Sequence, residues 1–174
     1  MLEDDVLGVL ADQLRLAEFL ILAESGNQGS AFRFLVFGRM KAPDFVAIRG
    51  VDVLVGECKV RPTQLFAKRF DCISDFECMA YLARTPDSKA RLAREACVRM
   101  NTLGVRMRAS RLNIYPAIIS AGSLARYHAP ACNAGVLLIT VDTSGQTIID
   151  IAGYQPDRLA RICGGKKQLT THRC

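Results

Sequence analysis

The sequence predicts an α/β protein built around a mixed sheet, and three observations carry that prediction. Half of the 174 residues are apolar and 23% are charged, the composition of a globular chain that can bury a core. Apolar residues recur at helical spacing near the N-terminus and again between residues 63 and 103. Between and after these stretches lie short runs of Val, Ile, Leu and Phe that are typical of strands. Helices that alternate with strands in this way favour an α/β architecture.

The first third of the chain is expected to supply one helix and three strands. Apolar residues three or four positions apart predict a helix over 2–24, which ends at a stretch rich in Gly, Ser and Asn. Strands are expected over 31–40, 43–48 and 51–60. Arg49-Gly50 would form the tight turn of a hairpin, because glycine readily adopts a positive φ.

The remainder is expected to add two helices, further strands and a polar end. A helix is predicted over 63–84, and a second is predicted to begin at Pro86 behind a Thr85 cap and to end at Gly104. We expect strands at 114–120, 136–141 and 147–152, and a last short helix at 157–163. Together these elements predict a single domain over 1–165, followed by a polar tail over 166–174.

Several broad classes of protein are disfavoured by the composition. The apolar runs are strand-sized, so no membrane segment is expected, and the acidic start of the chain differs from a secretion signal. Seven cysteines is an odd count, and no pair has the C-x-x-C spacing of a zinc site. We therefore expect reduced thiols in a cytoplasmic protein.

The positive charge is concentrated in one segment. The chain carries 23 Lys and Arg against 17 Asp and Glu, a net charge of +6. Residues 84–111 contain two acids, Asp87 and Glu95, and a basic surplus equal to that whole net charge. A local positive field suits a polyanion such as nucleic acid, although a solvated helix face would have the same composition. The basic residues of this segment are Arg84, Lys89, Arg91, Arg94, Arg99, Arg106, Arg108 and Arg111.

The most informative segment is the hairpin expected over 43–60. Alternation along a strand places Glu57 and Lys59 on one face. A two-residue turn at Arg49-Gly50 puts Asp44 diagonal to Glu57, and a register two residues looser puts the two carboxylates directly opposite. In either register, two carboxylates and an ammonium meet at one end of the hairpin, on a face otherwise made of valines that should be buried.

Two adjacent carboxylates repel each other unless a cation lies between them. The only ligands offered here are oxygen atoms, since no His or Cys cluster is present in the sequence. Oxygen ligands favour Mg²⁺, with Mn²⁺ as the alternative, over zinc. A bound divalent ion that activates water, beside a fixed lysine charge, is what hydrolysis of a phosphodiester requires.

The segment Pro43-Asp44, a spacer, then Glu57-Cys58-Lys59 resembles the PD-(D/E)xK nuclease superfamily, which includes restriction endonucleases and Holliday-junction resolvases. The resemblance covers the chain from the first helix to the strand at 114–120. It implies a restriction-endonuclease-like αβββαβ core and magnesium-dependent hydrolysis of DNA, with RNA left open. It also implies a homodimer, because cutting both strands of a duplex with a small domain takes two active sites.

The resemblance further implies roles for individual residues. Asp44, Glu57 and the carbonyl of Cys58 would be metal ligands, and Lys59 would orient or activate the water. Members of the superfamily often add a Glu from the first helix, for which Glu18 is the first choice and Glu24 the second.

Two other interpretations stay open at this point. The chain could be a nucleic-acid-binding or assembly subunit that keeps the fold without turnover. It could also be an unrelated α/β domain in which a short, degenerate motif occurs by chance.

Overall fold

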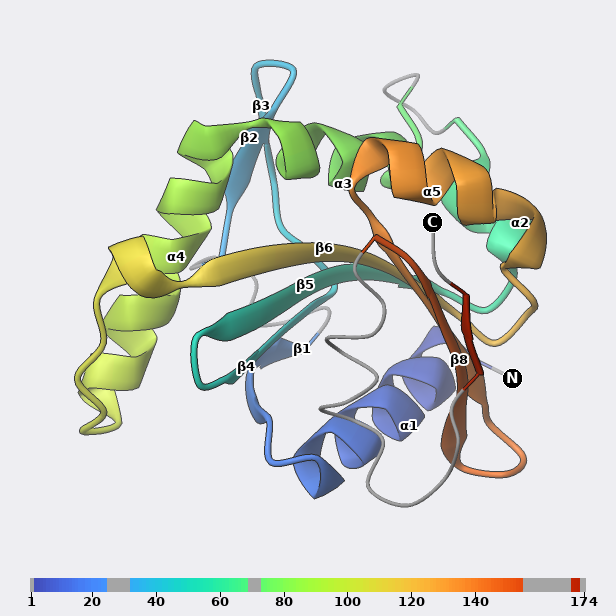
Figure 1. Cartoon of the computed structure of the whole chain (residues 1–174), viewed down its shortest axis with the longest axis horizontal. Coiled ribbons are helices and arrows are strands. Elements are labelled where there is room, and N and C mark those ends of the chain that lie inside the picture. The colour runs from blue at the N-terminus through green and yellow to red at the C-terminus, as the bar shows by residue number, and fades with distance from the viewer. Residues whose placement is uncertain (1, 25–31, 69–72, 155–169, 173–174) are drawn as a thin grey trace.

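The computed structural model describes residues 2–24, 32–68, 73–154 and 170–172, the last of these as backbone. Seven strands form one mixed sheet in the order β1-β4-β5-β6-β7-β8-β9 (Figure 1). The pairs β5–β6, β6–β7 and β8–β9 are parallel, and the other pairs are antiparallel. The strands span Leu20–Glu24 (β1), Phe45–Arg49 (β4), Asp52–Lys59 (β5), Asn113–Ser120 (β6), Leu137–Asp142 (β7), Thr147–Gly153 (β8) and Thr170–His172 (β9).

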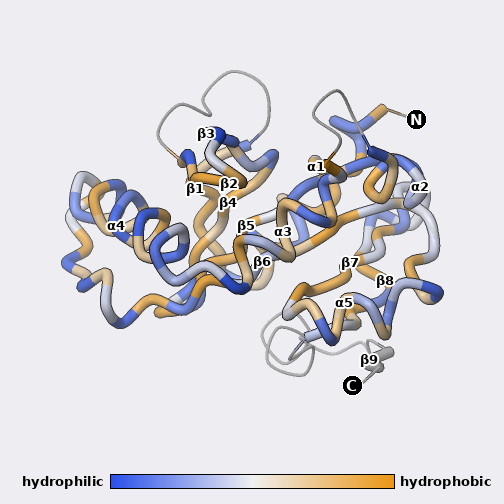
Figure 2. The backbone as a smooth tube through the Cα atoms, turned by 90° about the horizontal axis from the view of Figure 1, so that it is seen from above, coloured by the Kyte–Doolittle hydropathy of each residue, from blue (hydrophilic) through white to orange (hydrophobic). Residues whose placement is uncertain are grey.

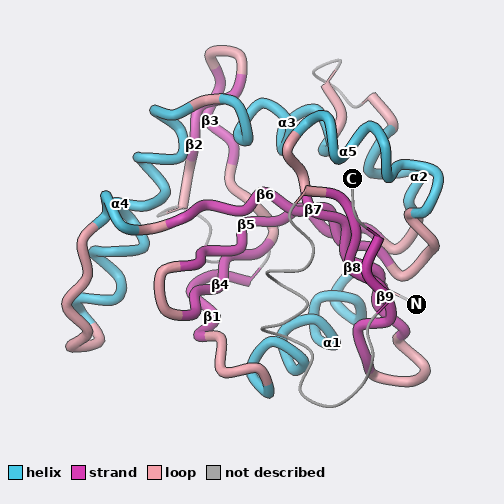
Figure 3. The backbone as a smooth tube through the Cα atoms, viewed as in Figure 1, coloured by secondary structure: helices cyan, strands magenta, loops and turns pink. Residues whose placement is uncertain are grey.

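Helices cover both faces of this sheet (Figures 1 and 3). Helix α1 (Glu3–Leu16) packs on one face, against β1, β5, β7 and β8. The other face carries α2 (Pro62–Phe66), α3 (Asp75–Arg84), α4 (Pro86–Thr102) and α5 (His128–Ala134). Two short 3₁₀ turns, Ala109–Arg111 and Ala125–Tyr127, flank β6. The expected α/β class, a mixed sheet flanked by helices, is confirmed.

Each face of the sheet has its own hydrophobic core, because the central strands are buried on both sides. Val53 and Val55 of β5 face α3, whereas Leu54 and Cys58 face α1. Such strands have continuous rather than alternating apolar sequences, and Figure 2 shows hydrophobic residues along β4 and β7. Gly56 lies where β5 meets β6, and a Cβ there would come within 2.3 Å of Ile119 Cδ1.

The first third of the chain differs from its prediction in two places. The N-terminal helix ends at Leu16, and Glu18 adopts a positive φ of 64°, so the apolar run that follows forms β1 instead of a last helical turn. The strand expected over 31–40 is a separate hairpin of β2 (Phe34–Val36) and β3 (Arg39–Lys41). This part of the chain still supplies one helix and three strands to the main sheet, namely β1, β4 and β5, and the β2–β3 hairpin forms a separate two-stranded sheet.

The helix expected over 63–84 is interrupted. Apolar spacing continues through the segment, but α2 ends at Phe66 and α3 begins after Ser74, whose hydroxyl accepts a hydrogen bond from the Glu77 N–H at 3.1 Å. This capping arrangement marks a new helix start. The next helix begins at Pro86 as predicted, and the chain turns after it at Gly104, where φ is +81°.

The last strands match their predictions closely, whereas the short helix expected at 157–163 lies outside the described residues. Within the tail expected at 166–174, residues 170–172 form β9, which pairs with β8. Cys58, Cys78 and Cys97 are free thiols, but Cys132 is disulfide-bonded, which contradicts the expectation of uniformly reduced cysteines. Within the described ranges, every helix is too short or too polar to cross a bilayer.

Candidate carboxylate–lysine site

The register of the β4–β5 hairpin decides how its carboxylates meet. Arg49 pairs with Asp52, so Gly50 and Val51 form the turn, and Phe45 pairs with Gly56. Extending this register by one step beyond β4 brings Asp44 level with Glu57. The tighter register with Arg49-Gly50 as the turn is wrong, and the looser alternative is confirmed. Because Val51 sits in the turn, its side chain is 40% exposed rather than part of the core.

Asp44 directly precedes β4, at the end of the hairpin away from the turn. Its Oδ2 accepts a hydrogen bond from the Cys58 N–H at 2.9 Å and lies 3.4 Å from Lys59 Nζ. The N–H and C=O of one strand residue leave the same edge of the strand. The Cys58 carbonyl therefore points toward the Asp44 side of β5, into the space beyond the end of β4. This places a third oxygen near the two expected carboxylate ligands.

Glu57 is a buried acid. Its side chain follows Val53 and Val55 on the face toward α3, and the residue is only 2% exposed. Oε2 lies 3.2 Å from Lys41 Nζ, whereas Oε1 is buried with no hydrogen-bond partner among the described residues. Burial raises the pKa of Glu57 well above its ordinary value, and the charge of Asp44 raises it further, while Lys41 lowers it.

Lys41 and Asp75 belong to the site, and the sequence analysis missed both. Lys41, at the end of β3, bridges the Glu57 carboxylate and Asp75 Oδ1, which lies 2.9 Å from Lys41 Nζ. Burial acts to lower the pKa of Lys41, but the charges of Glu57 and Asp75 outweigh it and the pKa is raised. The available signals were the position of Lys41 three residues before Asp44 and the capping box that begins α3 at Asp75.

Lys59 is nearly as buried as Glu57, with 6% exposed, and it joins the hairpin to the first helix. Its Nζ contacts Glu3 Oε1, in the first turn of α1, as well as Asp44. Burial acts to lower the pKa of Lys59, but the hydrogen bond to Glu3 and the charge of Asp44 raise it above the ordinary value. Lys59 is therefore a fixed positive charge beside Asp44, as the motif led us to expect.

The first-helix acid that reaches the site is Glu3, so the assignment of that role to Glu18 is wrong. Glu18 is 79% exposed and lies 3.0 Å from Arg49 Nη2, at the turn end of β4. Arg49 and Asp44 are five residue steps apart, which is about 16 Å along an extended chain. Glu24 pairs in register with Phe45, but its side chain binds Arg15, with Oε1 2.7 Å from Arg15 Nη2.

We call this group of six charged side chains the carboxylate–lysine cluster. Its four carboxylates and two ammoniums carry a net charge of −2 when all are ionised. A net negative charge and an unpartnered, buried carboxylate oxygen fit a divalent cation with oxygen ligands. In the part of the chain that the structure describes, no group of three His, Cys, Asp or Glu side chains is already placed to bind a metal ion. An ion held by Asp44 and Glu57 would take its other ligands from the Cys58 carbonyl and water. The members of the cluster are Glu3, Lys41, Asp44, Glu57, Lys59 and Asp75.

The basic residues of segment 84–111 lie apart from the cluster. The Asn113 N–H donates to the Val51 carbonyl at 2.8 Å, so the chain before β6 passes the turn end of the hairpin. From Asp52 to Lys59 the strand spans seven residue steps, about 23 Å. The arginines just before β6 are thus separated from Lys59 by the length of β5. Arg84 ends α3; Lys89, Arg91, Arg94 and Arg99 lie on α4; and Arg106, Arg108 and Arg111 precede β6.

No family model, curated protein or solved structure matches this chain.

Proposed function

We propose that the chain is a metal-dependent nuclease that hydrolyses DNA phosphodiester bonds, an endonuclease of restriction, defence or DNA-repair type. The observation that carries the proposal is that Asp44 Oδ2 accepts a hydrogen bond from the Cys58 N–H at 2.9 Å, next to Glu57, and lies 3.4 Å from Lys59 Nζ. The resemblance to PD-(D/E)xK nucleases supports the same conclusion. RNA is the alternative substrate, and a cytoplasmic homodimer is the proposed form.

Each residue of the cluster has a role in this proposal. Mg²⁺, or Mn²⁺ in its place, would supply an activated water and charge for the phosphate oxygens. Asp44 and Glu57 would hold the ion with the Cys58 carbonyl. Lys59 would orient the water and stabilise the charge that develops on the phosphate. Its contact with Glu3 fixes the ammonium, so no reorganisation is needed during the reaction.

The basic segment supplies binding in the same proposal. Seven of its eight basic side chains are exposed, and Lys89 is half-buried. Such residues neutralise backbone phosphates whatever the base sequence, which makes affinity depend on salt. This role needs no proximity to the cluster, because a duplex extends well beyond one cleavage site.

One observation favours the alternative of a nucleic-acid-binding subunit without turnover. Lys41 Nζ lies 3.2 Å from Glu57 Oε2 and 2.9 Å from Asp75 Oδ1, so an internal ammonium already compensates the buried carboxylate. If that contact is permanent, Glu57 is a structural acid. If it opens, Glu57 can coordinate an ion.

The two functions are separated by cleavage of supercoiled plasmid and branched DNA with 5 mM Mg²⁺ or Mn²⁺. We compare the wild type with Glu57→Gln, which preserves the shape of the side chain, and with Asp12→Asn, an exposed acid on the same protein. We expect Glu57→Gln to reduce the rate at least about 100-fold, because it removes a charged ligand, and Asp12→Asn to leave it unchanged.

Three results would count against the nuclease. Cleavage by Glu57→Gln at the wild-type rate removes the site. DNA binding without cleavage by the wild type supports the binding subunit. Neither binding nor cleavage supports an unrelated domain with a chance motif.

A further inference from the structure

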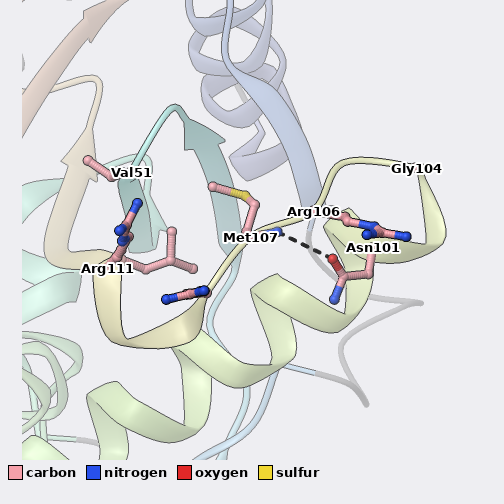
Figure 4. A pocket seen from close by; sticks show the side chains of 8 residues that line it. Val51, Asn101, Gly104, Arg106, Met107 and Arg111 are labelled. Carbon is pink, nitrogen blue, oxygen red and sulfur yellow. Dashed lines mark hydrogen bonds between the residues drawn. The ribbon is translucent and has the colours of Figure 1, made fainter.

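A second concave site lies at the opposite end of β5 from the carboxylate–lysine cluster. It is a broad, open hollow of about 980 Å³ between the end of α4, the chain leading to β6 and the turn of the β4–β5 hairpin. Figure 4 shows Arg106 beside Asn101 on one side and Arg111 beside Val51 on the other. This volume is at the upper end of the range for small-molecule sites. We call it the arginine pocket, and its lining includes Val51, Asn101, Arg106, Met107, Arg108 and Arg111.

The pocket carries uncompensated positive charge. Arg106, Arg108 and Arg111 are exposed, none of them makes an ion pair with any described residue, and the lining contains no acid. The residue next to Val51 in the chain is an acid, Asp52, whose Oδ1 accepts a hydrogen bond from Asn113 Nδ2 at 3.2 Å. Each lysine of the carboxylate–lysine cluster is paired with carboxylates, whereas these three arginines pair with no described side chain.

The pocket is held open by its backbone. Gly104 has a φ of +81°, which turns the chain away from α4. The Val105 N–H then donates to the Met100 carbonyl at 3.0 Å, and the Met107 N–H donates to Asn101 Oδ1 at 3.4 Å. These bonds place the three arginines on a loop fixed at both ends, since the 3₁₀ turn Ala109–Arg111 closes the other side.

The lining combines two kinds of surface. Guanidinium groups match phosphate oxygens in a planar, bidentate geometry, which makes arginine well suited to phosphate recognition. Val51, Met107 and Leu112 add apolar surface, which suits the face of a base or a sugar. An acidic peptide would use the charge but not the apolar part of the lining. A phosphorylated nucleotide uses both.

We infer that the arginine pocket binds a phosphorylated nucleotide, either the phosphorylated end of a nucleic-acid strand or a free nucleotide. The strand end deepens the proposed function, on which that source rests, because it would anchor the substrate about 23 Å from the cluster. The free nucleotide would make the pocket a separate ligand site on the same protein.

The test measures binding in EDTA, so that no hydrolysis is required. Fluorescence anisotropy compares 12-nucleotide single strands with a 5′-phosphate or a 5′-hydroxyl, and calorimetry uses adenosine 5′-monophosphate. The pocket variant is Arg106→Gln/Arg108→Gln/Arg111→Gln. The matched control is Arg91→Gln/Arg94→Gln/Arg99→Gln, which removes the same charge from exposed positions on α4.

We expect the wild type to prefer the 5′-phosphate strand at least about tenfold, or to bind the mononucleotide, or both. The pocket variant should lose that preference and that binding. The control should weaken both strands equally and keep the preference. Phosphate preference without mononucleotide binding identifies the strand end as the source, and mononucleotide binding without preference identifies the free nucleotide.

The inference is overturned if neither probe shows a phosphate effect, if the effect survives in the pocket variant, or if the control removes it equally. Thermal melting of both variants checks that each is folded. Glu57→Gln should retain the pocket's binding. A protein that binds through the pocket but never cleaves DNA therefore refutes the proposed nuclease and leaves this inference standing.

Discussion

The two ends of strand β5 use charge in opposite ways. At the C-terminal end, Glu57, Lys59 and Asp75 are buried, and Lys41 and Lys59 each lie within 4 Å of carboxylate oxygens. At the N-terminal end, the arginine pocket leaves three guanidiniums exposed and unpaired with described residues. Buried charges need partner charges inside the protein, whereas exposed charges are solvated by water and are free to bind a ligand.

This difference decides what substitution does at each end. Removing one member of the cluster leaves a partner charge in an apolar environment, so the folded state loses stability. Removing a pocket arginine leaves water in its place, so binding changes and folding does not.

The largest effect is expected for Lys41→Met. The substitution leaves the buried carboxylates of Glu57 and Asp75 without their ammonium, and breaking a buried pair in this way costs about 3 kcal/mol, toward the low end because Lys41 is 28% exposed. Urea denaturation at pH 7 measures the free energy of unfolding. Lys41→Met/Glu57→Leu should regain part of the loss, because it removes the stranded charge as well.

The control for Lys41→Met is Arg91→Met, an exposed position on α4 that should change stability by at most about 0.5 kcal/mol. A Lys41→Met protein as stable as this control would show that the bridge to Glu57 contributes nothing. The contrast between the two ends of β5 would then fail.

The next comparison uses two glycines. Gly56 lies in the second half of β5, and Gly104 lines the arginine pocket at the N-terminal end of that strand. A Cβ at Gly56 meets Ile119 Cδ1 at 2.3 Å, so Gly56→Ala should cost about 1–3 kcal/mol through overpacking. A Cβ at Gly104 meets nothing within 4 Å, but φ is +81°, so Gly104→Ala should cost about 1 kcal/mol through backbone strain. Urea midpoints measure both. Equal stability of Gly56→Ala and wild type would mean that Ile119 repacks without cost.

The local hairpin was more predictable from the sequence than the long-range contacts of the site. Period-two alternation placed Glu57 and Lys59 together, and the local sequence placed Asp44 at the facing end of the hairpin. Hairpin register depends on which residues form the turn, and Gly50-Val51 competes with Arg49-Gly50 for that place. A shift of two residues keeps the same face, so either register brings Asp44 and Glu57 to one face at the same end of the hairpin.

Long-range contacts were not predictable from local patterns. Lys41 reaches Glu57 because the β2–β3 hairpin packs against α3 and α4, and Glu3 reaches Lys59 because α1 packs against β5. Helical spacing in the first 24 residues does not show that the helix ends at Leu16. The segment Leu20–Glu24 is a strand because it pairs with β4, and local spacing does not reveal that pairing. The choice of Glu18 failed for this reason.

A pH effect of intermediate size follows from Glu57. Its raised pKa means that the folded state holds the proton more tightly than the unfolded chain does. Stability should therefore fall as the pH rises above the ordinary value of 4.5, with a slope of at most about 1.4 kcal/mol per pH unit. Urea denaturation between pH 5 and 8 should show a flatter profile for Glu57→Gln than for wild type or Asp12→Asn. Identical slopes would contradict the prediction.

The smallest effect on stability is expected at the arginine pocket. Arg106→Gln, Arg108→Gln and Arg111→Gln should each change the free energy of unfolding by at most about 0.5 kcal/mol, because the side chains are exposed. Their effect should appear instead in the salt dependence of DNA binding, where each lost phosphate contact on a duplex reduces the slope of log K against log salt by about 0.9. Anisotropy between 50 and 200 mM NaCl measures it. A variant that loses stability without losing salt dependence would place these arginines in the fold rather than at a ligand.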